Sequence, residues 1–477
     1  MSSTDQTVAP AAQPAAGIEL RSIQPVPESE RHGTVGQQWR LWYACNANFF
    51  CIVLGSFAVL LGLNLFWAIV AIVIGSVIGG VLTALHAVQG PRLGVPQMIQ
   101  SRGQFGFYFG VVLFVMGIVL DVGYMGGGLV VGAQSLQGVI SGLPIQAWIV
   151  IFAVPCVALA IWGYRWIHAV QPYLVVIMTG VWIAMLALIL SSGDHLAKGM
   201  GGAHLASFPI FLVVTGLFFM NQLSWAIYVS DYSRYMPKDT SGPRIFMAVF
   251  VGSTVSTVAF CALGAWVTAI APTAASPVTV IASVAGNWVL WFSALSLVAG
   301  AAMNAYTGML SWESARSTWQ NVGLSRLARV VGVVVVSGIA LVLALLGWRS
   351  FVNTFSNFLD VLLYVFVPWS LINLIDFYLV QRERYDVNSF YSARGIYGAW
   401  RWVAVIPYLL AVGSEFLFID QTDFKGPLVN ALGGADISWI VGGIVAAVGY
   451  LVAVRVAGSS AEALMAPVPV KIPRNGG

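Results

Sequence analysis

The segment GIVLDVGYMGGG, from Gly117 to Gly128, carries an acid and a phenol inside an otherwise apolar run. In a helix, Asp121, Tyr124 and Gly128 are spaced i, i+3 and i+7, so they share one face. An acid within a membrane helix costs roughly 2.5–3.5 kcal/mol on insertion scales, and it therefore usually faces the interior of the bundle. The adjacent glycines remove side-chain bulk and let a ligand or a neighbouring helix approach. Together these residues favour a polar pocket for a small ligand over simple helix packing.

Amides interrupt two other apolar segments. ACNANFF, from Ala44 to Phe50, contains Asn46 in the first segment. FFMNQLSWAIY, from Phe218 to Tyr228, contains Asn221 and Gln222 five segments later. Matching polar breaks in two halves of a chain are typical of transporters whose discontinuous helices meet at a central binding site. The alternative is that these amides only join helices by hydrogen bonds; we favour the binding site.

A planar ligand is suggested by the side chains beside these amides. Trp225 follows Asn221 at i+4 and Gln222 at i+3, and its flat ring suits stacking on a heterocycle. Asn304, in AGAAMNAYTG, can both donate and accept hydrogen bonds at the edge of such a ring. The residues that we predict to bind the ligand are Asp121, Tyr124, Trp225, Gln222, Asn221, Asn304, Asn46 and Gly128.

The composition requires a membrane. Of the 477 residues, 59% are hydrophobic and 8% are charged, whereas soluble domains carry about 25% charged residues. A membrane-spanning helix needs about 20 mostly apolar residues. The sequence repeats this pattern, and we predict an all-α integral membrane protein with twelve spans at about 41–62, 66–87, 107–136, 146–163, 170–190, 207–230, 245–270, 285–310, 328–346, 355–379, 402–418 and 436–456.

The spans form one transporter domain, 39–456, between polar tails at 1–38 and 457–477. Within the domain we expect repeat one at about 39–190, repeat two at about 207–380, and helices eleven and twelve at about 400–456. With both tails in the cytoplasm, all but three of the 22 Lys and Arg residues fall on the cytoplasmic side. Because cytoplasmic loops retain basic residues, we predict this orientation in the plasma (inner) membrane. The three exceptions are Lys198, Arg349 and Lys425.

Other classes of protein have little support in the sequence. The four cysteines form no CxxC pair, and HExxH, GxSxG and P-loop motifs are absent from the sequence. We therefore expect no enzyme activity, no cofactor, no metal site and no nucleic-acid partner. A channel is disfavoured by the two broken helices. Of the remaining acids, we expect Glu415 at the membrane interface and Asp376 paired with an arginine, whereas Asp360 and the oligomeric state stay unassigned.

Several long segments resemble one family. They are GIELRSIQPVPESERHG, GPRLGVPQMIQSRGQFG, SWAIYVSDYSRYMP, NLIDFYLVQRERYDVNSFY and GPLVNALGGADISWIVG, and they extend from Gly17 to about Gly442. They resemble the purine–cytosine permease branch of the nucleobase:cation symporter-1 family. The resemblance implies the LeuT-type fold, with five plus five helices in inverted repeats and two more at the C-terminus. It also implies alternating access to a central site for cytosine or a purine.

The resemblance also implies roles for individual residues. DVGY is similar to the QVGW pattern of bacterial cytosine permeases, so Tyr124 takes the position of a stacking Trp and Asp121 that of a substrate-reading Gln. A carboxylate there favours substrates that present amino donors. These two changes leave room for a vitamin B6 form, a thiamine-like heterocycle, a hydantoin or allantoin.

Asn304 fits the amide position of the eighth helix, and the sixth helix offers several candidates. Sodium-coupled relatives carry Ser or Thr before that amide, where this chain has Gly300 and Ala301. We therefore expect proton coupling through Asp121, with sodium as the alternative ion.

Overall fold

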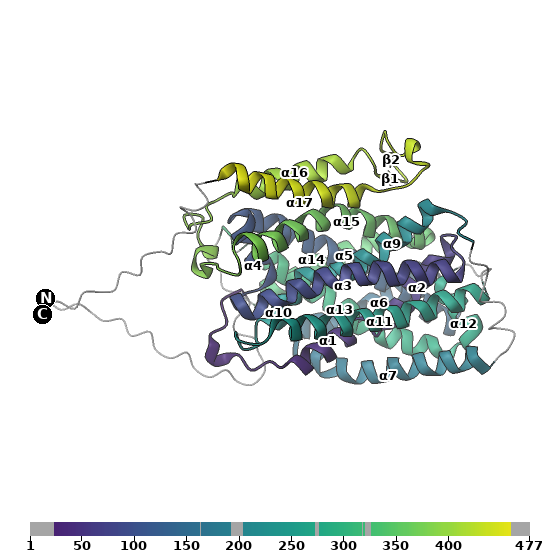
Figure 1. The fold of residues 1–477 in the computed structure, drawn as a ribbon. Helices are drawn as coiled ribbons and strands as arrows, with labels where there is room; N and C mark the ends of the chain where they lie inside the picture. Colours follow the sequence, from purple (N-terminus) through teal and green to yellow (C-terminus); the bar gives the residue numbers. More distant parts are fainter. Residues whose placement is uncertain are drawn as a thin grey trace, which may run out of the picture.

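The structure, a computed structural model, describes residues 23–162, 164–191, 204–271, 276–316, 318–319 and 326–458. Long helices dominate it and run side by side along one direction (Figure 1). The longest are α3 (Leu65–Leu93), α5 (Phe109–Val139), α6 (Ile145–Trp162), α7 (Tyr164–Ser191), α9 (Phe208–Leu223), α11 (Gly242–Ile270), α13 (Trp288–Arg316), α14 (Arg326–Gly347), α15 (Phe351–Ile375) and α17 (Ser438–Ala457).

Shorter elements connect and interrupt these helices. They are η1 (Glu28–Glu30), α1 (Val35–Asn46), α2 (Phe49–Leu60), α4 (Gln97–Phe105), η2 (Ser224–Ile227), α10 (Val229–Ser233), α12 (Pro277–Ala285), η3 (Trp348–Ser350), η4 (Asp376–Val380), η5 (Val387–Tyr391), α16 (Trp402–Glu415), β1 (Asp420–Gln421), β2 (Phe424–Lys425) and η6 (Asn430–Leu432). The two strands form an antiparallel hairpin. It lies at the end of the molecule opposite to α4 (Figure 1), and we call these two ends the hairpin end and the α4 end.

Nine helical segments of the described residues are long and apolar enough to cross a membrane, and the bent pair α1–α2 adds a tenth if it is one span. This differs from the twelve predicted spans for two reasons. One counted segment, Leu327–Val380, has 54 residues and holds two predicted spans. Helix α16 has only 14 residues, fewer than the roughly 20 of a full span.

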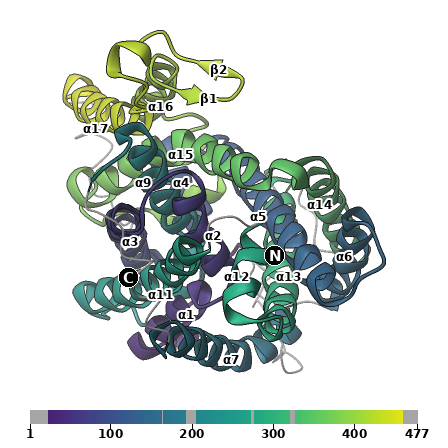
Figure 2. The same cartoon turned by 90° about the vertical axis from the view of Figure 1, so that its right-hand side faces the viewer.

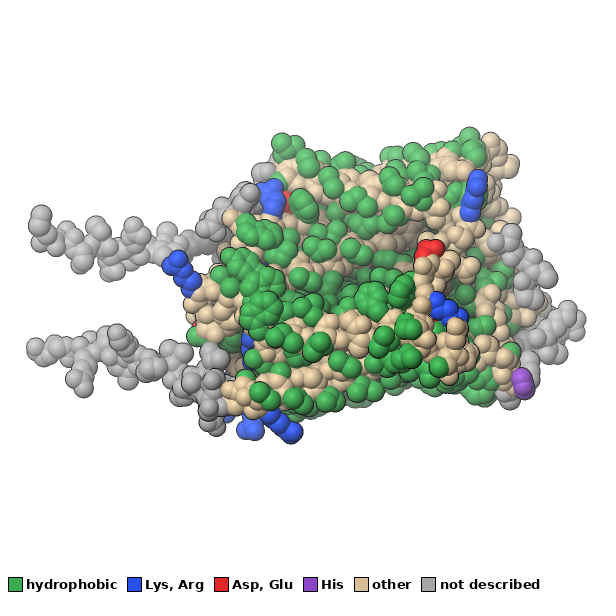
Figure 3. All heavy atoms as spheres, turned by 90° about the horizontal axis from the view of Figure 1, so that it is seen from above, with side chains coloured by type: hydrophobic (Ala, Val, Ile, Leu, Met, Phe, Trp, Pro, Cys, Tyr) green, Lys and Arg blue, Asp and Glu red, His purple; other side chains and the backbone are tan. Residues whose placement is uncertain are grey.

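The outer surface matches a lipid environment. Hydrophobic side chains cover the middle of the face in Figure 3, and the Lys and Arg side chains lie toward the two ends. Val154, Val176 and Leu346 are among the large apolar side chains that stay exposed. Helices suit such surroundings because they satisfy their own backbone hydrogen bonds, which lipid cannot do. The fold is therefore that of a multi-pass membrane protein.

The helices form two packed groups, which are separated in Figure 2. One group contains α1, α2, α3, α9 and α11, and the other contains α5, α6, α13 and α14. Backbones touch within the first group: a methyl added at Gly55 would overlap the carbonyl oxygen of Cys261, and one at Gly264 would overlap that of Ile52. Such small-residue contacts let membrane helices pack closely. Helix α15 contacts both groups, through α9 and α5, and α16 and α17 pack against α15.

The first break lies between α1 and α2, where the helix axis bends by 55°. Asn48 occupies the break and satisfies both free helix ends. Its Oδ1 accepts a hydrogen bond from the N–H of Cys51 at 3.0 Å, which caps α2. Its Nδ2 donates to the carbonyl oxygen of Cys45 at 2.7 Å, which satisfies the end of α1. The break lies inside the segment Ala44–Phe50 that the sequence indicated.

The second break follows α9, which gives way to the 3-10 turn η2 and then to α10. Backbone carbonyls near this change accept hydrogen bonds from side chains. Ser224 Oγ donates to the carbonyl oxygen of Asn221 at 2.8 Å. Thr83 of α3 donates to that of Gln222, also at 2.8 Å. Side-chain hydroxyls thus stabilise the interruption that was predicted within Phe218–Tyr228.

A buried polar network fills the α4 end. Asp376 is fully buried there and forms an ion pair with Arg401 at 3.1 Å, so it pairs with an arginine as predicted. It also accepts hydrogen bonds from Tyr385 and Tyr450. The network continues through amides and hydroxyls into α3 and α10, and its further members are His86, Gln89, Gln97, Ser101, Gln104, Ser230, Ser370 and Asn373. We call this set the α4-end network.

Glu415 is buried at the end of α16. The residue is 0% exposed, and neither carboxylate oxygen has a hydrogen-bond partner in the described part of the chain. Its side chain fills the space left by Gly442 of α17, where an added methyl would overlap the carboxylate. A glycine on the neighbouring helix thus makes room for the acid inside the packing, and its place at the depth of the membrane interface stays a prediction.

Candidate functional site

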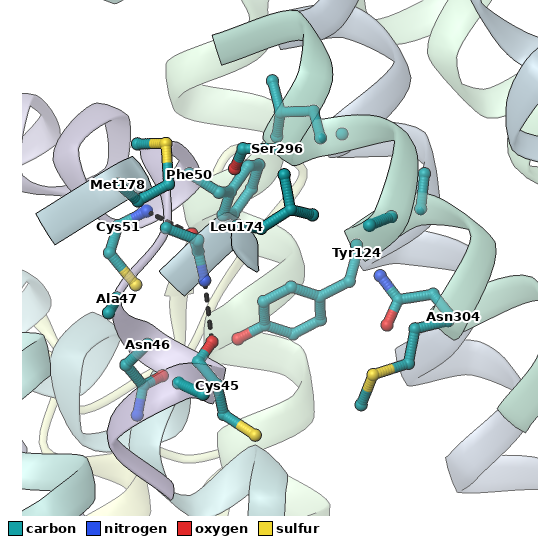
Figure 4. Close-up of a pocket in the computed structure, with 18 of the residues that line it drawn as sticks. Cys45, Asn46, Ala47, Phe50, Cys51, Tyr124, Leu174, Met178, Ser296 and Asn304 are labelled. Carbon is teal, nitrogen blue, oxygen red and sulfur yellow. Dashed lines mark hydrogen bonds between the residues drawn. The ribbon is translucent and has the colours of Figure 1, made fainter. Parts of the chain in front are cut away.

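A central cavity of about 130 Å³ lies where the two helix groups meet the first break (Figure 4). Residues of α1, α2, α5, α7, α9, η2 and α13 line it. The described residues of this lining carry no charged side chain. Six of the eight residues predicted from the sequence are among them: Asn46, Tyr124, Gly128, Asn221, Trp225 and Asn304.

Tyr124 extends from α5 into this cavity (Figure 4). Its ring packs at an angle to Phe50 and edge-on to Phe355, with centroid distances of 6.1 and 5.5 Å. Its hydroxyl donates a hydrogen bond to Oδ1 of Asn221 at 3.3 Å. Asn304 of α13 also lines the cavity, and it is drawn beside Tyr124 in Figure 4. Two amides from different helices therefore flank one aromatic residue.

Trp225 is held by the first break. Its indole N–H donates to Oδ1 of Asn46 at 3.1 Å. The amide of Asn46 in turn donates to the carbonyl oxygen of Ser253 at 3.4 Å, and Trp42 packs edge-on against the indole at 5.8 Å. A side-chain hydrogen bond between the two broken helices thus holds a flat aromatic surface at the cavity.

Gln222 is the first of the two predicted residues that do not line the cavity. It is fully buried, and its Oε1 accepts a hydrogen bond of 3.5 Å from the Asn46 amide. Its Cβ lies close to α3, because a methyl added at Gly79 would come within 2.7 Å of it. The side chain packs inside the first helix group, where it can act on the ligand only through Asn46.

Asp121 is the second predicted residue that does not line the central cavity. The residue is 1% exposed and is absent from the cavity lining. Its Oδ2 accepts a hydrogen bond from the Tyr228 hydroxyl at 2.6 Å, and its Oδ1 accepts one from the Thr307 hydroxyl at 2.7 Å. In this conformation each oxygen accepts a hydrogen bond from a protein hydroxyl, and Asp121 does not line the central cavity. The amino-substituted substrate stays a prediction without a direct contact in this conformation.

A second and larger cavity, of about 480 Å³, lies on the other side of Asp121. Tyr228 and Thr307 line it, and Met303 lines both cavities. Sequence reasoning missed Tyr228 and Thr307. A usable signal existed for Thr307, because it follows Asn304 at i+3 on the same helix face. Asp121 lines neither cavity, whereas both of its hydrogen-bond partners line the second one.

The region proposed for a cation in sodium-coupled relatives offers few oxygens here. Gly300 and Ala301 have no side-chain oxygen. The hydroxyl of Ser296, one turn earlier, accepts a hydrogen bond from the N–H of Phe49 at 3.4 Å. Across the described residues, no group of three or more His, Cys, Asp or Glu side chains could hold a metal ion.

Comparison with known proteins identifies the relatives of this chain. The family model "Permease for cytosine/purines, uracil, thiamine, allantoin" matches residues 25–442. The "Putative purine-cytosine permease YxlA" of Bacillus subtilis is 32% identical over 444 residues, which cover 92% of this chain and 96% of the relative. Purine-cytosine permease fcyB of Emericella nidulans is 25% identical over 466 residues, 91% and 88% of the two chains.

Solved structures give the fold. The inward-facing conformation of Mhp1 matches with a TM-score of 0.75 at 20% identity, covering 95% of this chain and 99% of Mhp1. Mhp1 in a closed conformation with bromovinylhydantoin bound, described as a nucleobase-cation-symport-1 family transporter, matches at 0.72 and 18% identity, covering 93% and 96%. The protein has the LeuT-like fold of Mhp1.

Proposed function

Because the chain belongs to the nucleobase:cation symporter-1 family, whose members found here are transporters and not enzymes, we propose that it imports a neutral planar nitrogen heterocycle. Cytosine and the purine bases are the first candidates. One observation carries the proposal: the cavity between the broken helices joins an aromatic surface to two amides and, within its described lining, has no charge. Alternating access would open this cavity to each side of the membrane in turn.

The uncharged lining narrows the choice of substrate. Burying an unpaired charge is costly, so a thiamine cation is disfavoured. A vitamin B6 form, a hydantoin and allantoin are the alternatives. The relatives include a vitamin B6 transporter of Saccharomyces cerevisiae and a hydantoin permease of Microbacterium maritypicum, at 25% and 24% identity.

The proposed topology has twelve spans, arranged as two inverted repeats of five and two further helices. The bent pair α1–α2 and the interrupted α9–η2–α10 are then the first helices of the two repeats. We place both termini and the α4 end in the cytoplasm of a cell whose plasma membrane holds the protein. The distribution of Lys and Arg supports this orientation, since only Lys198, Arg349 and Lys425 would then lie outside.

The proposed coupling ion is a proton, carried by Asp121. A protonated carboxyl has a hydrogen-bond donor at one oxygen, so its hydrogen bonds with Tyr228 and Thr307 would be weakened or rearranged. Protonation would therefore change the hydrogen bonds by which α5 contacts the second break and α13. The lack of side-chain oxygens at Gly300 and Ala301 supports a proton over sodium, which remains the alternative ion.

The test is uptake of radiolabelled cytosine and hypoxanthine into proteoliposomes under an inward proton gradient, an inward sodium gradient, or neither. With one proton per substrate, a gradient of one pH unit can drive about tenfold accumulation. We expect proton-driven accumulation that does not need sodium. Accumulation driven only by sodium would assign the coupling to that ion, and uptake of neither compound would overturn the proposed substrates.

The variant Asp121→Asn tests the carrier. We expect it to bind and exchange substrate but to lose pH-driven accumulation, because an amide cannot take up the proton. Asp420→Asn at the hairpin is the matched control and should accumulate substrate as the unaltered protein does. Full pH-driven uptake by Asp121→Asn would rule out this residue as the proton carrier.

A further inference from the structure

Asn221 holds a hydrogen-bond donor without a partner. The residue lines the central cavity and is 4% exposed. Its Nδ2 is buried and has no hydrogen-bond partner among the described residues. Leaving a buried donor unpaired costs about 1–3 kcal/mol. A substrate that brings an acceptor to this amide would remove that cost, so the donor is a binding determinant.

Tyr124 binds one atom of the Asn221 amide. The tyrosine ring is packed between Phe50, Phe355 and Phe358, with centroid distances of 6.1, 5.5 and 6.3 Å. Its hydroxyl donates to Oδ1 of Asn221. In the structure the packed phenol is thus paired with the amide oxygen, and the amide nitrogen is free.

The main chain of Asn221 is held as well. Its carbonyl oxygen accepts the hydrogen bond of Ser224 Oγ at 2.8 Å, at the point where α9 ends. The side chain therefore projects from a fixed position beside the second break. The amide itself can still rotate, and in the structure its oxygen is bound to the Tyr124 hydroxyl.

We propose that Tyr124 and Asn221 together select substrates that carry a carbonyl oxygen on the ring edge facing α9. The chemical class is the neutral cyclic amide, in which the carbonyl oxygen accepts the free N–H of Asn221. Asn221 makes the contact and Tyr124 is the positioning residue. This inference rests on the proposed function and deepens it, since it replaces the expectation of an amino edge by that of a carbonyl edge.

The test compares two pairs of compounds that differ in one ring amide, that is, a carbonyl group and its neighbouring N–H: cytosine with 4-aminopyrimidine, and hypoxanthine with purine. Dissociation constants are measured by titration on the purified full-length protein. In at least one pair, the carbonyl compound should bind about tenfold or more tightly, since a hydrogen bond left unmade at a buried donor costs about 1.4 kcal/mol or more. We call the quotient of the two constants the carbonyl preference.

Three variants show whether the two residues set this preference. Asn221→Leu should bring the carbonyl preference close to one. Tyr124→Phe keeps the ring and loses only the hydroxyl, so the amide can rotate and the preference should fall severalfold. The control Tyr378→Phe loses a comparable hydrogen bond, to the carbonyl oxygen of Leu85 at 2.8 Å, far from the cavity lining, and should keep the preference.

The possible failures are distinct. If none of the four compounds binds, the proposed function falls and this inference falls with it. If compounds bind but Asn221→Leu keeps the carbonyl preference, or if the unaltered protein prefers the compounds without the carbonyl, only the selection by Asn221 is overturned. If Tyr124→Phe alone keeps the preference, the positioning role of Tyr124 is overturned.

Discussion

The central cavity and the α4-end network are both built from buried amides and tyrosines, but they differ in how completely these groups are paired. In the network, Gln97 donates to Gln89 at 3.0 Å and accepts from Ser230 at 2.6 Å. In the cavity, Nδ2 of Asn221 has no partner within the described residues. Fully satisfied networks rigidify a structure. Buried groups without partners call for an explanation, and here a ligand provides one.

His86 shows how far the network determines its members. Its Nδ1 lies 3.0 Å from Nε2 of Gln97, which can only donate, so Nδ1 is an acceptor. The ring proton is then on Nε2, which donates to Ser370 Oγ at 2.9 Å. Trp369 stacks on the ring with centroids 4.9 Å apart. The neighbours thus select one neutral tautomer, and both ring nitrogens of His86 already have hydrogen-bond partners in the network.

The largest effect should be a loss of stability in Asp376→Asn, which breaks the ion pair with Arg401 inside the α4-end network. Removing one partner of a buried pair typically costs about 3–5 kcal/mol, because a charge is left uncompensated. We expect a clear fall in the thermal unfolding midpoint of the purified protein. Lys425→Gln, at a half-exposed pair with a separation of 4.0 Å, is the control and should cost less than about 1 kcal/mol. Equal midpoints for both variants would contradict a structural role for the network.

An intermediate effect is expected from Asn46→Ala, and it should appear in binding. The change removes the acceptor of the Trp225 indole N–H. Because the ring is then free to turn, affinity for the best-bound compound of the cytosine and hypoxanthine pairs should fall about tenfold, which corresponds to about 1.4 kcal/mol. Isothermal titration measures it. Asn64→Ala, at the N-cap of α3, is the control. Unchanged affinity in Asn46→Ala would show that Trp225 does not need this bond.

The smallest effect should come from Glu415→Met. The carboxylate has no hydrogen-bond partner among the described residues, so its replacement by an apolar side chain removes a buried polar group that is not compensated. The unfolding midpoint should stay the same or rise slightly. A fall of several degrees would mean that the acid has a stabilising partner, as the members of the α4-end network do.

The helix breaks could be predicted because amides are costly in an apolar segment. Asn48 lies in the predicted segment and caps α2. The family also follows from sequence segments alone, and residues 25–442 match it. The count of twelve spans rested on hydropathy, and two of the predicted spans, 328–346 and 355–379, fall on α14 and α15, which the short turn η3 connects.

The role of Asp121 as a substrate reader could not be judged from spacing. Positions i, i+3 and i+7 share a helix face, but three residues also correspond to about 4.5 Å along the helix axis. This shift places Asp121 beyond the lining of the cavity that contains Tyr124. The two hydroxyls that occupy its oxygens come from Tyr228 and Thr307, more than 100 residues away in the chain. Only tertiary packing brings them together.

The close contact of α2 with α11 has a consequence for how the chain can vary. At Gly55 and Gly264 even one methyl group would overlap a backbone carbonyl of the facing helix, whereas at Gly300 an added methyl meets nothing within 4 Å. In a saturation library selected for uptake, the first two positions should return glycine alone, and Gly300 should accept alanine and serine. Glycine would thus be required at positions 55 and 264 and replaceable at position 300.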